Sequence, residues 1–336
     1  MITELFVALS GIDVAAVMGA IPPPCRTAPC SFSVVNIDES EALIELPPCR
    51  PRVAVRHLLP SLSVLTDRPY SARFELSTRS DRTWSSWVAT TTLGSAAFGA
   101  LPAAAGGLTC DVDVYTTTAP VEEMTLCVRV AAADLRAVLD APWMATLSVS
   151  DVGPLASPDA AREPLRLTVP ARSQMQAPSE IAARICSPTS VAMVLEYWSR
   201  PEDTASLAAE MFNAATDCYG VWPSAIQAAG RRGVAGYLLR FPDWSAATWC
   251  LARGLPIIAS VRYAAGELGG AAITETSGHL VVITGHEGDD VLVNDPAAPT
   301  AASVRRRYRI EELRRAWLER NGVGYVLFRP DEIRGA

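Results

Sequence analysis

The sequence is poor in several residue types, and each shortage argues against a class of function. Lysine is absent, so all 29 basic residues are arginine, and 36 acidic residues outnumber them. The net charge of −7 argues against the basic surface that nucleic-acid binding requires. No run of about 18 apolar residues occurs, so no segment is expected to cross a membrane. Histidine is limited to His57, His279 and His286, which leaves few residues for imidazole chemistry.

The N-terminal segment lacks the features of a secretory signal. Glu4 and Asp13 interrupt its apolar residues, and no basic residue precedes them, whereas a signal peptide begins with positive charge and continues with an apolar run. We therefore expect a cytoplasmic protein, and export by a route that needs no such signal stays compatible with the sequence.

The eight cysteines are scattered through the chain and are not spaced as a disulfide framework. Cys25, Cys30 and Cys49 lie upstream of His57, but their spacing matches no common zinc-binding pattern. We therefore expect no metal at this cluster and no cofactor elsewhere. His57 is interpreted as an ordinary core or surface histidine.

The length and composition predict two folded domains. A chain of 336 residues with 49% hydrophobic and 19% charged residues can build two separate cores. Residues 1–165 are expected to form a β-rich, sandwich-like domain of unknown role, because short segments there alternate polar with apolar residues. The predicted strands are residues 73–78, 110–115, 124–130 and 143–149, with one helix at 132–139.

Residues 166–336 are predicted to form an α+β domain. Helical segments come first and strand-like runs follow, without the βαβ alternation of a parallel sheet. Asp243 and Gly254 bracket one of the helices as its N-cap and its C-terminal stop. The predicted helices are residues 188–198, 204–216, 223–232 and 244–253, and the predicted strands are 256–262, 279–284, 291–295 and 323–328.

A cysteine lies at the start of one of these helices. Ser187 is a suitable N-cap and Pro188 a suitable first helical residue. Five consecutive apolar residues, 191–195, indicate that the helix is buried. Cys186 would then lie immediately before the helix, where unpaired N–H groups and the positive end of the dipole stabilise a thiolate. The alternative interpretation is a small buried thiol that only fills space.

A predicted hairpin downstream brings a histidine and an acid together. If its turn centres on Glu287, His279 lies opposite Asp295 and the two side chains share one face of the sheet. The imidazole could then donate one N–H to the carboxylate and turn its other nitrogen toward a nucleophile. Asn294 points to the other face in this register, although a slip of one residue would exchange the two.

Two further features receive ordinary interpretations. His286 falls in the expected turn and is interpreted as a solvated loop histidine. Arg305, Arg306 and Arg307, with further arginines at 309, 314 and 315, form a local basic cluster. A solvated face is the favoured interpretation of this cluster, and recognition of an acidic substrate or partner is the alternative.

Three separated blocks of the second half resemble the bacterial peptidase C39-like family, which has a papain-like fold. They are VPARSQMQ…ICSPTSVAMVLEYW, YGVWPSAIQAAGRRG and SGHLVVITGHEGDDVLVNDPAA, in that order from residue 169. The resemblance implies that Cys186 is the nucleophile, His279 the base and Asp295 the group that orients it. It also implies that Gln174 supplies a side-chain N–H to the oxyanion hole, with Gln176 as the competing candidate.

The resemblance implies a cysteine peptidase or amidase that cleaves a peptide or amide bond through an acyl-enzyme. Ser187 follows the cysteine where family members usually have glycine, which affects the expected substrate more than the expected chemistry. The expected partner is a peptide or protein substrate, with no nucleic acid, membrane, metal or cofactor. Two alternatives remain: an acyltransferase or transpeptidase that uses the same triad, and a binding protein whose peptidase domain is degenerate.

Overall fold

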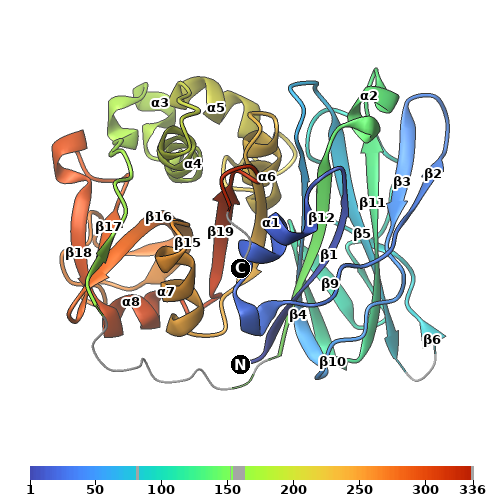
Figure 1. Ribbon diagram of the computed structural model, residues 1–336, viewed down its shortest axis with the longest axis horizontal. Helices are drawn as coiled ribbons and strands as arrows, with labels where there is room; N and C mark the ends of the chain where they lie inside the picture. Colours follow the sequence, from blue (N-terminus) through green and yellow to red (C-terminus); the bar gives the residue numbers. More distant parts are fainter. Residues whose placement is uncertain (81–82, 152, 154–162, 334–336) are drawn as a thin grey trace.

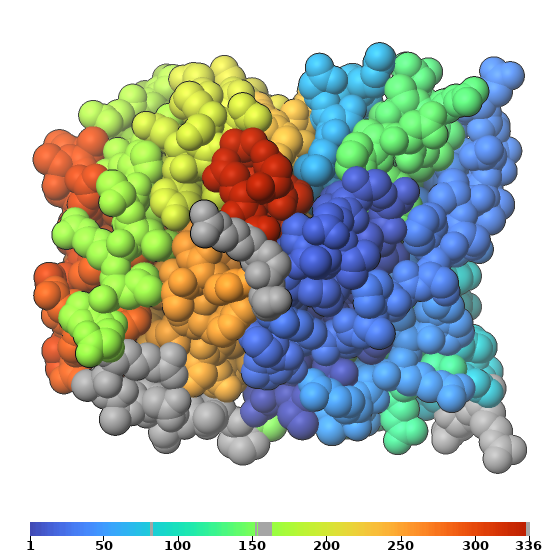
Figure 2. All heavy atoms as spheres, in the orientation of Figure 1, coloured from blue at the N-terminus to red at the C-terminus, as the bar shows by residue number. Residues whose placement is uncertain are grey.

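The computed structural model describes residues 1–80, 83–151, 153 and 163–333. The chain forms two halves that lie side by side, one made mainly of strands and the other of helices packed on a further sheet (Figure 1). In the space-filling view the first half, blue to green, abuts the second, light green to red (Figure 2). Within the described ranges, no helix is both long and apolar enough to span a membrane.

The N-terminal half contains two antiparallel sheets. One has the strand order β1-β12-β4-β10-β9-β8, and the other has the order β2-β3-β11-β5-β6 with β7 beside β5. Leu62 and Leu147 of the first sheet lie in one hydrophobic cluster with Phe74 and Leu126 of the second. The elements are β1 (Thr3–Ser10), α1 (Val14–Gly19), η1 (Pro23–Cys25), β2 (Ser33–Asn36), β3 (Glu41–Glu45), β4 (Val55–Val64), β5 (Ser71–Ser80), β6 (Thr83–Trp84), β7 (Val88–Ala89), β8 (Ala104–Ala105), β9 (Leu108–Asp111), β10 (Val114–Val121), β11 (Glu123–Ala131), α2 (Leu135–Asp140) and β12 (Trp143–Ser150).

Three of the strands expected in this half are present as β5, β11 and β12, and the expected helix is present as α2. The predicted single strand at 110–115 is wrong, because β9 ends at Asp111 and β10 begins at Val114. The chain turns through Val112, which has a left-handed φ of 58°. A two-residue turn preserves the alternation of polar and apolar residues, so the pattern alone cannot reveal it.

The second half contains an antiparallel sheet with the order β14-β19-β15-β16-β17-β18, to which β13 is added by pairing with β16. Helix α4 lies against β16. Helices packed on an antiparallel sheet agree with the α+β prediction. The elements are β13 (Leu165–Arg166), η2 (Gln174–Gln176), α3 (Ser179–Ala182), α4 (Cys186–Tyr197), α5 (Thr204–Met211), α6 (Trp222–Gly230), β14 (Ala235–Arg240), α7 (Trp244–Ala252), β15 (Ile257–Tyr263), β16 (Thr276–Glu287), β17 (Asp290–Asn294), η3 (Ala301–Ser303), β18 (Arg305–Arg309), α8 (Ile310–Ala316) and β19 (Val323–Phe328).

All four helices expected in the second half are present, each with bounds that differ from the predicted ones by one or more residues. Helix α4 begins at Cys186 with Ile185 as its N-cap, so Ser187 is not the cap. Pro188 is tolerated at the third position because the first N–H groups of any helix have no intrahelical partner. Helix α5 ends at Met211 and not at residue 216, because Asn213, the second residue after it, donates through its amide to Thr92 O of the other half (2.8 Å).

The predicted hairpin register is wrong by two residues. Ile283 lies opposite Val293 and not opposite Val291, and a β-bulge follows Ile283. A shift of two residues leaves each side chain on its original face. His279 and Asp295 therefore stay on a common face, although Asp295 lies beyond the last residue of β17.

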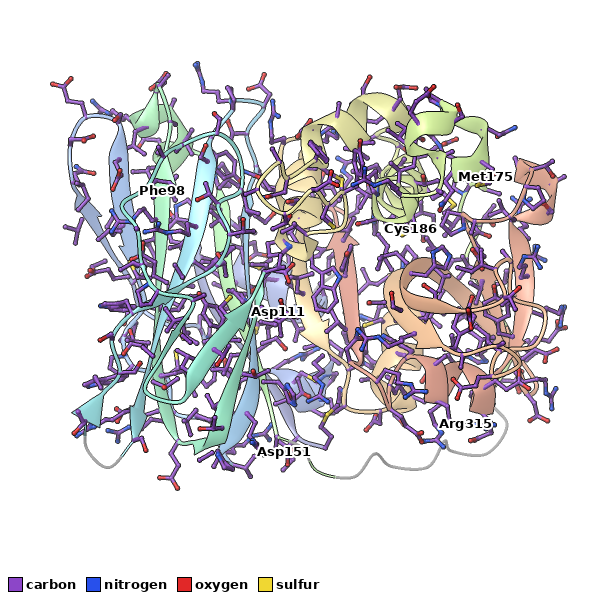
Figure 3. All side chains as sticks on the ribbon, turned by 180° about the vertical axis from the view of Figure 1, so that it is seen from behind. Phe98, Asp111, Asp151, Met175, Cys186 and Arg315 are labelled. Carbon is purple, nitrogen blue, oxygen red and sulfur yellow. The ribbon has the colours of Figure 1, made fainter. Side chains whose placement is uncertain are left out.

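The two halves share buried contacts. The Tyr237 hydroxyl donates to Ala20 O (2.6 Å). Residues of β1 and α1 also belong to one hydrophobic cluster with residues of the sheet in the C-terminal half. Asp113, in the turn between β9 and β10, accepts a hydrogen bond from the Trp222 N–H at the start of α6 (2.6 Å). Asp111, the last residue of β9, is seen at the junction of the halves in Figure 3.

Candidate active site

Cys186 is the first residue of α4 and is partly exposed, whereas residues 187–195 of the helix are buried. The position differs from the prediction by one residue, since the cysteine belongs to the helix and does not precede it. The thiol nevertheless lies at the N-terminal end, where free backbone N–H groups favour a negative charge. The backbone N–H groups of Leu280 and Ser187 both interact with the sulfur.

His279 and Asp295 form a buried pair. The imidazole Nε2 lies 2.8 Å from Asp295 Oδ1, and the two residues are 3% and 0% exposed. The His279–Asp295 pairing predicted from the sequence is therefore present despite the different register. Because Nε2 faces the carboxylate, Nδ1 is the ring nitrogen left for Cys186.

Three further donors hold the Asp295 carboxylate. The Ala297 N–H donates to Oδ1 (3.0 Å), while the Tyr308 hydroxyl (2.6 Å) and the Ala272 N–H (3.4 Å) donate to Oδ2. Burial alone would raise the pKa of Asp295, but the hydrogen bonds with His279 and Tyr308 hold it below the ordinary carboxyl value.

Cys186 and His279 act on each other's ionisation. Burial opposes ionisation of the thiol, but the imidazole of His279 keeps the pKa of Cys186 below the ordinary thiol value. Burial also opposes charging of the imidazole, yet Asp295 and the thiol together raise the pKa of His279 to about 10. Both shifts favour a thiolate–imidazolium pair at neutral pH, which is the activated form of a nucleophilic cysteine.

Gln174 and Gln176 have different surroundings. Gln174 is 3% exposed and its Nε2 donates to Ala182 O (2.8 Å), whereas Gln176 is exposed. Among the described residues, Gln174 Oε1 has no hydrogen-bond partner although it is buried. The backbone N–H of Gln174 donates to Pro296 O (2.8 Å), which ties the η2 turn to the residue after Asp295.

Sequence reasoning missed two supporting residues. Tyr308 lies in β18, within a run of arginines that was interpreted only as a basic cluster; alternation along a strand places it on the face opposite Arg307. Asn294 does not compete for His279, because its Nδ2 donates to Val169 O (3.2 Å) and Pro170 O (3.0 Å). It thereby fixes the segment that leads to Gln174.

The remaining histidines lie elsewhere. His286 was interpreted as a solvated loop residue, which is wrong: β16 continues to Glu287, and His286 is buried within it at 6% exposure. His57 lies in β4. Burial is the main cause that lowers its pKa to about 4, and the positive charges of Arg240 and Arg56 lower it further. In the part of the chain that the structure describes, no three residues gather as metal ligands.

Ser187, the residue after Cys186, contacts Tyr325 in the core. The Ser187 hydroxyl lies 3.3 Å from the Tyr325 hydroxyl, and both residues are fully buried. The side chain that replaces the usual glycine is therefore directed into the core. It does not narrow the exposed side of Cys186.

Comparison with known proteins gives one family match. Residues 166–325 match the model of the Peptidase C39 like family, which confirms the resemblance seen in the sequence and supports a peptidase-type function. No curated protein matches the chain.

Two solved structures match about half of the chain. A double glycine motif protease from an AMS/PCAT transporter, solved with its leader peptide, is 18% identical, with a TM-score of 0.33 over 50% of this chain and 99% of that one. A putative C39-like peptidase from Bacillus anthracis is 19% identical, with a TM-score of 0.39 over 49% of this chain and 98% of that one.

Proposed function

We propose that the protein is a cysteine peptidase or amidase in which Cys186, His279 and Asp295 form the catalytic triad. The observation that carries the proposal is the buried His279–Asp295 pair, whose imidazole also lowers the pKa of the Cys186 thiol at the N-terminal end of α4. A structural cysteine has no need of an imidazole whose other nitrogen is held by an acid. The substrate class, a peptide or protein, follows from the family match.

The reaction begins when the Cys186 thiolate attacks the carbonyl carbon and forms a tetrahedral intermediate. The oxyanion accepts hydrogen bonds from the Cys186 backbone N–H and from the Gln174 Nε2–H that is not donated to Ala182 O. The His279 imidazolium then gives its proton to the leaving amine, and the C–N bond breaks to leave a thioester. Water, deprotonated by His279, hydrolyses the thioester and restores the free thiol.

The N-terminal half is proposed to be a β-sandwich, since its two antiparallel sheets contribute side chains to one core. Its turn at Asp113 supports the start of α6 through the Trp222 N–H. We propose that this half serves as a scaffold for the peptidase half.

Selective alkylation tests the activated pair. Iodoacetamide at about pH 6, where an ordinary thiol is mostly protonated, should modify Cys186 ahead of the other seven cysteines, as mapped by mass spectrometry. The variant His279→Ala should lose this selectivity, because no imidazolium then stabilises the thiolate. Equal reactivity of Cys186 in both proteins would refute the pair.

Turnover tests the reaction itself. Digestion of a peptide mixture should yield new free amines with the native protein and none with Cys186→Ala. Adding hydroxylamine, which intercepts thioesters, should convert part of the product to hydroxamate. Cleavage that persists in Cys186→Ala would overturn the assignment of the nucleophile.

A further inference from the structure

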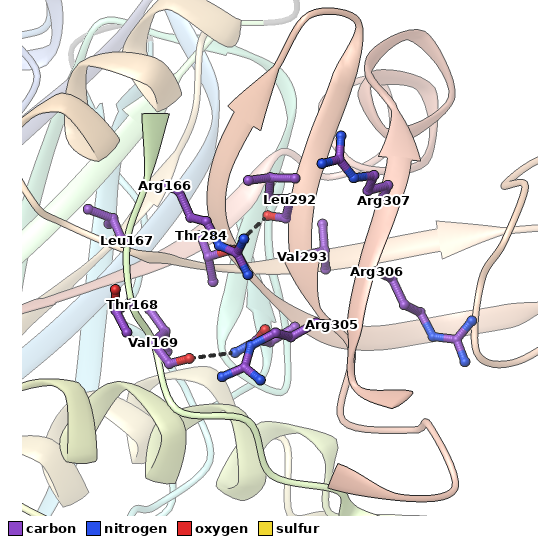
Figure 4. Close-up of a pocket in the computed structure, with 11 residues that line it drawn as sticks. Arg166, Leu167, Thr168, Val169, Thr284, Leu292, Val293, Arg305, Arg306 and Arg307 are labelled. Atoms are coloured by element: carbon purple, nitrogen blue, oxygen red, sulfur yellow. Dashed lines mark hydrogen bonds between the residues drawn. The ribbon is translucent and has the colours of Figure 1, made fainter. Parts of the chain in front are cut away.

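A cavity of about 590 Å³ lies between the segment 166–169 and strands β17 and β18 (Figure 4). Its volume falls in the range of small-molecule sites, roughly 300–1,000 Å³. Neither Cys186, His279 nor Asp295 lines it, so it is separate from the candidate active site. The described lining contains no acidic residue and includes Arg166, Leu167, Leu292, Arg305, Arg306 and Arg307.

The arginines of β18 are divided between the two faces of the strand. Successive residues of a strand point to opposite sides, and Figure 4 shows the guanidinium of Arg306 turned away from that of Arg305. Arg306 Nη1 donates to Gly270 O (2.7 Å). Arg307 forms ion pairs with Glu287 and Asp290. The charge of Arg307 is therefore largely compensated by the protein.

Arg166 and Arg305 are not compensated in this way. Neither guanidinium has a hydrogen bond or an ion pair with any residue that the structure describes, and both line the same cavity. Two like charges that share a cavity repel each other, and an anion between them removes that repulsion. Guanidinium groups bind phosphate and carboxylate oxygens through paired N–H donors.

The segment that carries Arg166 is held in place. The Leu167 N–H donates to Thr284 O (2.7 Å), and the Asn294 amide donates to Val169 O (3.2 Å). Both bonds join the segment to residues of the sheet. The cavity is therefore built before any ligand enters, which reduces the entropy lost on binding.

We propose that this cavity binds a small ligand through its phosphate or carboxylate oxygens, with Arg166 and Arg305 as the principal donors. The proposal does not depend on the catalytic function. A ligand of this kind would contact the apolar side chains of Leu167 and Leu292 with its uncharged part, since both line the cavity.

Calorimetric titration of the full chain tests the proposal, with pyrophosphate and citrate as separate probes. At about 0.02 M salt we expect saturable binding of at least one probe, and weaker binding at about 0.2 M salt because exposed charges are screened. Tighter binding of pyrophosphate identifies phosphate as the preferred group, and tighter binding of citrate identifies carboxylate. Failure of both probes to bind would overturn the proposal.

Substitutions locate the binding. Arg166→Ala and Arg305→Ala should each weaken the preferred probe at least tenfold, because each removes a charge-assisted contact. Arg200→Ala is the matched control, since Arg200 is exposed and its guanidinium also has no partner among the described residues. If Arg200→Ala weakens binding equally, the anion is held by net charge alone and the proposal is wrong. Thermal melts without ligand check that each variant is folded.

Discussion

At the scale of single residues, Asp295 is held by more hydrogen bonds than its partners in the proposed triad. It accepts four hydrogen bonds, from His279, Ala297, Tyr308 and Ala272. These bonds fix the direction of both carboxylate oxygens, and through Oδ1 they fix the ring of His279. The orientation of the imidazole thus depends on a tyrosine that lies in a different strand.

Replacing that tyrosine should change the acid side of the pH profile. Tyr308→Phe removes a donor to a carboxylate, so the pKa of Asp295 should rise toward its ordinary value. The depressed pKa contributes stability that is present at neutral pH and is lost as pH falls through the folded value. We therefore expect Tyr308→Phe to reduce stability at pH 7 by about 1–3 kcal/mol and to shift the acid limb of Cys186 alkylation to higher pH.

Tyr263→Phe is the control for this prediction. The Tyr263 hydroxyl donates to Ile273 O (3.3 Å) and not to Asp295. Its loss should leave the acid limb of the alkylation profile in place. A common shift in both variants would mean that Tyr308 acts only through general packing.

At the scale of secondary-structure elements, the sequence predicted that His279 lies beside Asp295 but not the register that brings them together. Cys186, His279 and Asp295 were chosen as candidates because helix signals, strand patterns and family motifs coincide at them. The register was missed because a β-bulge after Ile283 depends on contacts with other strands. Tyr308 was missed because arginines surround it, and the strand β18 that directs it to Asp295 forms only by pairing with β17.

The turn between β9 and β10 allows a prediction about pH and stability. Burial raises the pKa of Asp113 to about 7, from about 3.9 in an unfolded chain. The folded state therefore binds the proton of the Asp113 carboxyl more tightly than the unfolded state does. The stability that this protonated carboxyl contributes is complete below about pH 4 and is lost as pH rises through about 7. Asp113→Asn keeps an acceptor for the Trp222 N–H without the titration.

The stability of Asp113→Asn relative to the native protein should therefore improve between pH 5 and pH 8. Melting temperatures at the two pH values measure the difference. Asp140→Asn, at an exposed position at the end of α2, should show no such trend. A constant difference for Asp113→Asn would contradict the buried, proton-binding state of this carboxyl.

At the scale of the whole molecule, the two halves do not have independent cores. Leu5, Val7 and Val17 of the first half lie in one hydrophobic cluster with Tyr237 and Phe328 of the second. Cooperative unfolding follows when domains share buried apolar surface. The predicted boundary at residue 165 separates the two halves along the sequence, but their buried side chains pack into one shared cluster.

Calorimetry should therefore show a single unfolding transition for the full chain. The fragment 166–336 alone should melt at a lower temperature and bind a hydrophobic dye, because residues such as Tyr237 would lose their cover. The fragment 1–165 is the matching control, and it should also melt at a lower temperature than the full chain. Two separate transitions in the full chain, each reproduced by one fragment, would show that the halves are independent.

The contact between Asp113 and the first turn of α6 also limits how such a protein can change over time. A domain joined only by a linker can be exchanged for another in one recombination event. Here an exchange of the first half would remove the acceptor for the Trp222 N–H and the cover of Tyr237 together. We therefore expect relatives that keep this interface to inherit both halves as one unit, with matched substitutions in the β9–β10 turn and at the start of α6.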